Sequence, residues 1–133
     1  MTHRIASCSC GQLTAKASEK PIRVSVCHCY ARQRRTGSVF ASQARFARSA
    51  VEISGTGTDY VRTGDDGGRA RLTFCPTCGV TVYYVAEGRE DNIVIPVRAF
   101  TDSSFSAPTF SVYEDRMHSW VTMPMPMDME HMG

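Results

Sequence analysis

The chain has 133 residues, of which 42% are hydrophobic, and a formal net charge of +2. This length predicts one domain with a single core. The sequence contains no run of about 18 apolar residues, which disfavours a membrane span, and so small a charge disfavours a nucleic-acid partner. The N-terminal stretch lacks the apolar segment of a signal peptide, so we expect a cytoplasmic protein whose cysteines are kept as thiols.

Short β-rich runs alternate with turn residues at intervals of about 8–12 residues, which is typical of an all-β domain. We expect strands at residues 13–17, 22–26, 38–41, 50–53, 59–63, 70–74, 80–85, 92–97 and 109–113. Tyr30–Arg35 favours a short helix, and Gly67-Gly68 predicts a hairpin turn. Residues 1–122 are therefore interpreted as one β domain. The Met- and Pro-rich segment 123–133 is interpreted as a tail to which we assign no function.

All six cysteines fall in three close pairs, which indicates metal binding. Cys75-Pro76-Thr77-Cys78-Gly79 has the spacing of a zinc knuckle, in which a tight turn aims two sulfurs at one point. A tetrahedral site needs two further ligands, and Cys8 and Cys10, also followed by a glycine, supply them. A redox pair would need a βαβ context that this chain lacks, and a reducing cytosol disfavours disulfides. The sequence thus predicts one structural zinc (Zn) bound by Cys8, Cys10, Cys75 and Cys78.

The remaining pair, Cys27 and Cys29, is ambiguous. Two thiolates alone make a poor zinc site, and His28 between them should point to the opposite side of an extended segment. The pair is either two free thiols or part of a reactive site. Three arginines follow closely, and they form either a solvated face or an anion-binding patch: Arg32, Arg34 and Arg35.

The motifs CSCG, CHCYARQRRTGSVF, RLTFCPTCGV, IPVRAFTD and RMHSW resemble the glutathione-dependent formaldehyde-activating enzyme family, which also includes centromere protein V-like proteins. The likeness covers roughly residues 5–122. It implies an all-β fold of the type shared with methionine sulfoxide reductase B, built on a zinc held at the positions of Cys8, Cys10, Cys75 and Cys78. Catalytic members read Cys-His-Cys-x-x-Cys at the second motif, and those three cysteines hold a second zinc with an open position.

This chain departs from that pattern because Arg32 stands where the third cysteine belongs. The change exchanges a soft anionic ligand for a permanent cation. We therefore expect the second zinc to be absent or weakly bound unless another side chain completes the site; His118, Glu114 and Asp115 are the alternatives. A guanidinium beside Cys27 or Cys29 would favour the thiolate, so the pair is expected to be reactive without metal.

Two functions remain open from the sequence, which does not decide whether the protein is an enzyme. The first is a carbon–sulfur lyase that joins or separates a small-molecule thiol such as glutathione and a small aldehyde. Its catalytic residues would be Cys27 and Cys29, and its substrate carboxylate would bind to Arg32, Arg34 and Arg35. The second is a non-catalytic zinc domain that binds a thiol or an anionic ligand, or acts as a protein adaptor.

Overall fold

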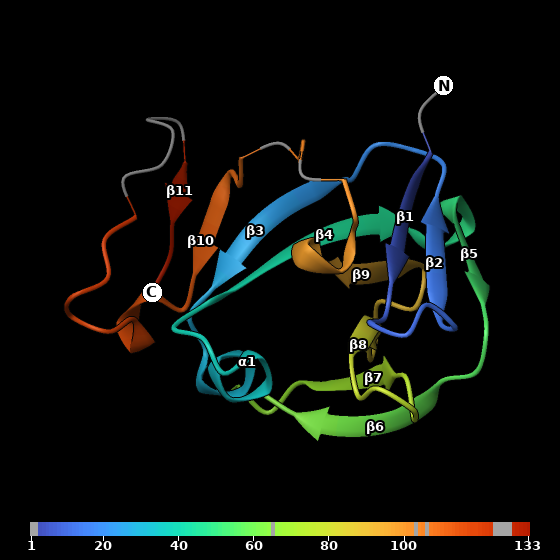
Figure 1. The fold of residues 1–133 in the computed structure, drawn as a ribbon. Coiled ribbons are helices and arrows are strands. Elements are labelled where there is room, and N and C mark those ends of the chain that lie inside the picture. Colours follow the sequence, from blue (N-terminus) through green and yellow to red (C-terminus); the bar gives the residue numbers. More distant parts are fainter. Residues whose placement is uncertain (1–2, 65, 103, 106, 124–128) are drawn as a thin grey trace.

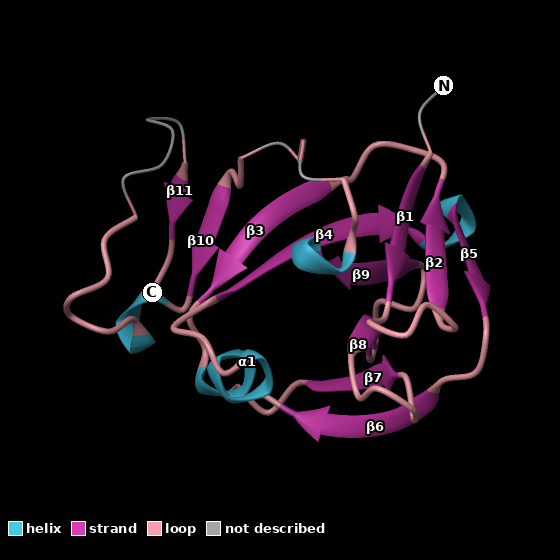
Figure 2. Ribbon diagram, in the orientation of Figure 1, coloured by secondary structure: helices cyan, strands magenta, loops and turns pink. Residues whose placement is uncertain are grey.

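The computed structural model describes residues 3–64, 66–102, 104–105, 107–123 and 129–133, and its elements are mainly β-strands (Figure 2), as predicted. The strands are β1 Arg4–Ser7, β2 Thr14–Ala17, β3 Arg23–Cys27, β4 Ala41–Ala47, β5 Val51–Ser54, β6 Thr58–Thr63, β7 Arg69–Phe74, β8 Thr81–Ala86, β9 Asn92–Pro96, β10 Phe110–Val112 and β11 Glu130–His131. The helical elements are α1 Tyr30–Thr36 and three single turns, η1 Arg48–Ala50, η2 Val97–Ala99 and η3 Glu114–Arg116. No helix in these described ranges is long and apolar enough to cross a membrane.

The strands form two sheets (Figure 1). The smaller sheet has the order β1-β2-β5 and is antiparallel. The larger has the order β11-β10-β3-β4-β9-β8-β7-β6, in which β10 runs parallel to both of its neighbours. This order places the end of β3, where Cys27 lies, beside β10, which is more than eighty residues later in the chain.

The main core lies between the two sheets. Small residues on β1 and β2 let the smaller sheet approach the larger sheet closely. Large side chains from the larger sheet and from the loop after η2 fill the space between the sheets. The largest of these are Phe46, Ile93, Ile95 and Phe100, each at most 1% exposed. A second, smaller cluster on β7, β8 and β9 contains Tyr84, which is 2% exposed. Its hydroxyl group points out of that cluster toward α1, where it binds an arginine.

Eight of the nine expected strands lie within about two residues of the observed ones at each end. The expected strand at 38–41 is wrong, because residues 38–40 belong to the loop after α1 and β4 begins at Ala41. That strand, ASQARFA, contains no β-branched residue, so its composition does not signal a strand. β1 was not expected either. Within the segment interpreted as a tail, Met129 is buried and β11 pairs with β10.

A four-cysteine cluster and an arginine-bound thiol pair

Two turns from distant parts of the chain bring four sulfurs together. Cys8 and Cys10 lie between β1 and β2, and Cys75 and Cys78 lie between β7 and β8. All four Sγ atoms lie within 4.8 Å of one another, with separations of 3.6 Å for Cys8–Cys10 and for Cys10–Cys75. Sulfurs placed about 2.3 Å from a tetrahedral ion would be about 3.8 Å apart. The four cysteines predicted as ligands therefore fit a metal ion such as zinc.

The surroundings of Cys75 favour the thiolate that metal binding requires. The Gln12 side-chain amide donates a hydrogen bond to Cys75 Sγ at 3.0 Å, and the Thr77 backbone N–H donates another at 3.3 Å. Burial raises the pKa of Cys75, but these donors outweigh it and lower the pKa to about 6. Gly79 completes the turn with φ of 82°, a conformation that is strained for any residue with a side chain.

Cys27 and Cys29 lie where β3 ends and α1 begins, and both are buried, at 0% and 3% exposed. Arg32, in the first turn of α1, directs Nη1 toward both sulfurs, at 3.4 Å from Cys27 Sγ and 3.5 Å from Cys29 Sγ. The guanidinium thus occupies the point on which the two thiols converge. The sequence-based expectation of a guanidinium beside these thiols matches this geometry.

The other edge of the Arg32 guanidinium is fixed by two residues that the sequence analysis missed. Tyr84 Oη accepts hydrogen bonds from Arg32 Nε at 3.2 Å and Nη2 at 2.9 Å, and donates one to Gln43 Oε1 at 3.0 Å. Both partners are buried on strands of the larger sheet, β8 and β4. Arg32 is therefore held in one orientation, with its remaining nitrogen committed to sulfur.

This arrangement divides the two thiols into one acid and one base. The hydrogen bond from the Cys27 thiol, together with the hydrogen bond and positive charge of Arg32, lowers the pKa of Cys29 to about 5. The same sulfur–sulfur contact, together with burial, raises the pKa of Cys27. At neutral pH the pair shares one proton, and the directions of the two pKa shifts place it mainly on Cys27, which leaves the thiolate mainly on Cys29.

Alkylation by iodoacetamide should therefore favour Cys29 over Cys27. Since its pKa is lowered, the reactive thiolate is present above about pH 5 and is lost as the pH falls through that value. We expect the rate of Cys29 labelling, followed by peptide mass spectrometry, to rise between about pH 4 and 6 and then level off. Arg32→Gln should move this midpoint upward. A midpoint of Cys29 near that of an ordinary thiol in the unmodified protein would contradict electrostatic activation.

Cys29 opens into a cavity of about 600 Å³ that is rich in arginine. Two acidic side chains also line it: Asp66 accepts a hydrogen bond from Tyr113 Oη at 2.7 Å, and Glu87 lies 3.6 Å from Arg69. Six arginines contribute to the walls, namely Arg23, Arg32, Arg45, Arg62, Arg69 and Arg89. The described lining of this cavity is therefore strongly cationic, which suits an anionic ligand.

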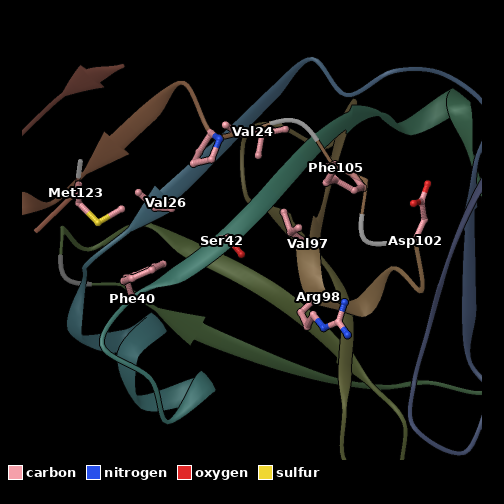
Figure 3. A pocket seen from close by; sticks show the side chains of 11 residues that line it. Val24, Val26, Phe40, Ser42, Val97, Arg98, Asp102, Phe105 and Met123 are labelled. Carbon is pink, nitrogen blue, oxygen red and sulfur yellow. The ribbon is translucent and has the colours of Figure 1, made fainter. Parts of the chain in front are cut away.

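A second cavity, of about 400 Å³, lies on the opposite face of β3 and β4 (Figure 3). Side chains alternate between the faces of a strand. Val24 and Val26 accordingly line this apolar cavity, whereas Arg23 and Gln43 line the arginine-rich one. Phe40 and Phe105 complete the apolar lining. Because its lining holds no cysteine, we do not assign the thiol chemistry to it.

The three arginines predicted to bind substrate are not equivalent. Arg32 lines the cavity of Cys29, whereas Arg34 and Arg35 line a neighbouring cavity of about 650 Å³ between α1 and β6. Arg34 is exposed, but Arg35 is partly buried, with its Cζ 5.9 Å from the centre of the Tyr84 ring. Arg62, which sequence reasoning missed, lines both cavities.

The expected alternative metal ligands have other partners in the structure. Glu114 Oε2 lies 2.6 Å from His131 Nδ1, Asp115 pairs with its neighbour Arg116, and His118 Nε2 lies 2.8 Å from Gln33 Oε1. Within the described ranges, the four-cysteine cluster is the one group of three or more candidate ligands whose atoms converge.

His28 points away from the two sulfurs, in keeping with the extended backbone around it. Its Nε2 lies 3.1 Å from Ser111 Oγ, and its backbone N–H donates to Val112 O at 3.1 Å. Burial lowers the pKa of His28. The residue therefore attaches the cysteine-bearing segment to β10.

Comparison with known proteins adds a family and a fold. Residues 3–116 match a family model described as "Glutathione-dependent formaldehyde-activating enzyme". A crystal structure of a Rhodobacter sphaeroides protein is similar, with a TM-score of 0.57 and 20% sequence identity over 77% of this chain and 90% of that chain. At this identity the likeness shows a shared fold. A search of curated proteins gave no match.

Proposed function

Because the chain belongs to the glutathione-dependent formaldehyde-activating enzyme family, we propose that it forms or cleaves carbon–sulfur bonds between a small-molecule thiol such as glutathione and a small aldehyde. The observation that supports this most directly is the contact of Arg32 with both Cys27 and Cys29. It keeps a reactive sulfur at the family's second cysteine motif although the third cysteine is missing.

In the proposed reaction the Cys29 thiolate attacks the aldehyde carbon. A carbon–sulfur bond forms as the carbonyl π bond breaks, and the developing alkoxide is stabilised by the Arg32 guanidinium. The alkoxide then takes the proton of the Cys27 thiol, which leaves a Cys27 thiolate paired with Arg32. Reversal of these steps returns the proton to Cys27 and frees the aldehyde beside a thiol RSH bound in the cavity. The sulfur of RSH then bonds to the carbonyl carbon as the π bond breaks, and the proton of RSH passes to the carbonyl oxygen, so that the net reaction is RSH + R′CHO → RSCH(OH)R′.

The metal at the four-cysteine cluster has a different part in this proposal. We assign zinc to that cluster, where four protein ligands close the coordination sphere and leave no position for substrate. Its contribution is to tie the β1–β2 turn to the β7–β8 turn. No disulfide joins the six cysteines in the structure, and the reducing cytosolic location that we also propose favours this state.

An assay with glutathione and formaldehyde tests the proposal. We expect adduct formation above the spontaneous rate, and a return to the spontaneous rate in Cys29→Ser, because serine has no thiolate at neutral pH. Arg71→Gln is the control, since Arg71 is exposed on β7 and lines neither the cavity of Cys29 nor the cavity of Arg34 and Arg35. An absence of catalysis at high protein concentration would instead support the second candidate, a zinc domain that binds an anionic ligand in the arginine-rich cavity.

A further inference from the structure

Three guanidinium groups crowd around one tyrosine between α1 and β6. Arg32 and Arg35, one helical turn apart, place their Cζ atoms 5.2 Å and 5.9 Å from the centre of the Tyr84 ring. Arg62 on β6 lines the same cavity as Arg35, and burial and then the charge of Arg32 lower its pKa. Burial is also the main cause that lowers the pKa of Arg35. The three positive charges therefore lie close together in a region that is partly shielded from water.

Only one of the three is fully satisfied by the protein. Arg32 donates to Tyr84 and to both thiols, as described above. By contrast, Nε and Nη2 of Arg35 and Nε and Nη1 of Arg62 are buried and make no hydrogen bond. Neither residue takes part in an ion pair within the described ranges. Buried charged donors without acceptors are strongly unfavourable, so this arrangement is expected to have an anionic partner.

The two acidic side chains that line the Cys29 cavity do not meet this need. Asp66 accepts hydrogen bonds from Tyr113 Oη and from the Gly68 backbone N–H, and Glu87 pairs with Arg69. The Cys29 thiolate also acts on both Arg35 and Arg62, but Arg32 already contacts it.

We propose that Arg35 and Arg62 form an oxyanion-binding site, and that a reactant handled at Cys29 brings a carboxylate to it. The assignment to a reactant rests on the function proposed above, whereas the anion site does not. Arginine forks match carboxylates in charge and geometry. The site lies in the cavity of about 650 Å³ that both arginines line, and Arg62 connects it to the cavity of Cys29.

The carboxylate has two chemical sources. It belongs either to the thiol, as in glutathione, or to the aldehyde, as in an α-oxo acid such as glyoxylate. Formaldehyde and β-mercaptoethanol carry no carboxylate, so they serve as neutral counterparts. A neutral aldehyde with a neutral thiol would leave the buried nitrogens of Arg35 and Arg62 unpaired.

Anion binding can be measured without any turnover. We expect succinate, which has neither thiol nor aldehyde, to shift the side-chain Nε–Hε resonances of Arg35 and Arg62 saturably in ¹⁵N NMR spectra at constant ionic strength, and to leave that of Arg71 unchanged. Arg62→Gln should weaken binding about tenfold or more, because a charge-assisted hydrogen bond contributes about 1.5–3 kcal/mol. Arg71→Gln should bind as the unmodified protein does. If neither Arg35 nor Arg62 responds to succinate, the anion site is wrong.

Turnover with the four thiol–aldehyde combinations then identifies the source. If the thiol supplies the carboxylate, Arg35→Gln and Arg62→Gln should raise KM about tenfold for glutathione and should not change KM for β-mercaptoethanol. If the aldehyde supplies the carboxylate, the same substitutions should raise KM for glyoxylate and should not change KM for formaldehyde. Equal effects on charged and neutral reactants would overturn the assignment of the site to a reactant.

The Cys29→Ser variant separates the two proposals. It should lose turnover but still bind succinate, because serine preserves the volume and the arginines remain. Succinate binding in a protein that shows no turnover with any combination refutes the proposed reaction and supports the anion site. Turnover without succinate binding would refute the anion site and support the proposed reaction.

Discussion

Cys75→Ser is expected to release the metal and to abolish cooperative unfolding. Cys75 is one of the four cysteines of the cluster and is fully buried against the main core. Structural zinc contributes on the order of 10 kcal/mol to the stability of small metal-binding domains, which is comparable to the entire free energy of unfolding of a typical domain. Elemental analysis should show about one zinc per chain before the substitution and almost none after it, and circular dichroism should show no sharp thermal transition.

Cys29→Ser is the matched control for this experiment. It also removes one buried cysteine, but from outside the four-cysteine cluster. We expect this variant to keep its metal and its thermal transition. A Cys75→Ser protein that retains a full complement of metal would contradict the assignment of the four cysteines as ligands.

Arg32→Cys is expected to create a second metal site. The substitution replaces the cation that lies 3.4 Å and 3.5 Å from the two sulfurs with a third thiolate, on the first turn of α1. Three thiolates with an open position form a competent zinc site, whereas two thiolates beside a guanidinium do not. We expect metal content to rise from about one to about two ions per chain. Substitution with Co²⁺ should give additional thiolate-to-metal charge-transfer absorption.

Arg32→Ala separates the gain of a ligand from the loss of a charge. It removes the same guanidinium and the same hydrogen bonds to Tyr84, but it supplies no sulfur. We expect about one metal ion per chain in this variant. Two ions per chain in the unmodified protein would show that some other group already completes a site with Cys27 and Cys29, and that Arg32 does not replace a ligand.

The sequence was sufficient to predict the four-cysteine cluster, because each half of the cluster is local. Two cysteines and a glycine within a few residues indicate a turn that aims both sulfurs in one direction, whatever the rest of the fold does. The position of Arg32 beside the thiols was also accessible, since it is three residues beyond Cys29 at the start of a helix.

The partners of Arg32 could not be predicted in the same way. Tyr84 and Gln43 come from β8 and β4, which are separated by β9 in the larger sheet. Their contact depends on strand order, and composition does not determine strand order. Arg62 lies on the edge strand β6. The sequence of that strand, TDYVRT, gives no sign that Arg62 is partly buried while its neighbours are exposed.

The predicted set of substrate-binding arginines can be subdivided from helix geometry alone. The sequence analysis treated Arg32, Arg34 and Arg35 as a single substrate-binding set. Residues three apart share a helix face, which joins Arg32 with Arg35, whereas Arg34 lies two positions after Arg32 and points elsewhere. The structure shows this division: Arg34 is exposed, and the other two approach Tyr84.

The order of the ligands along the chain has a consequence for biosynthesis. The four-cysteine cluster is complete within the first 78 residues. The segment that carries Cys27 and Cys29 is instead fastened to β10, through the pairing of Cys27 with Val112 and the His28–Val112 hydrogen bond. A nascent chain on the ribosome therefore presents all four candidate ligands before β10, which supports the thiol pair, has been synthesised.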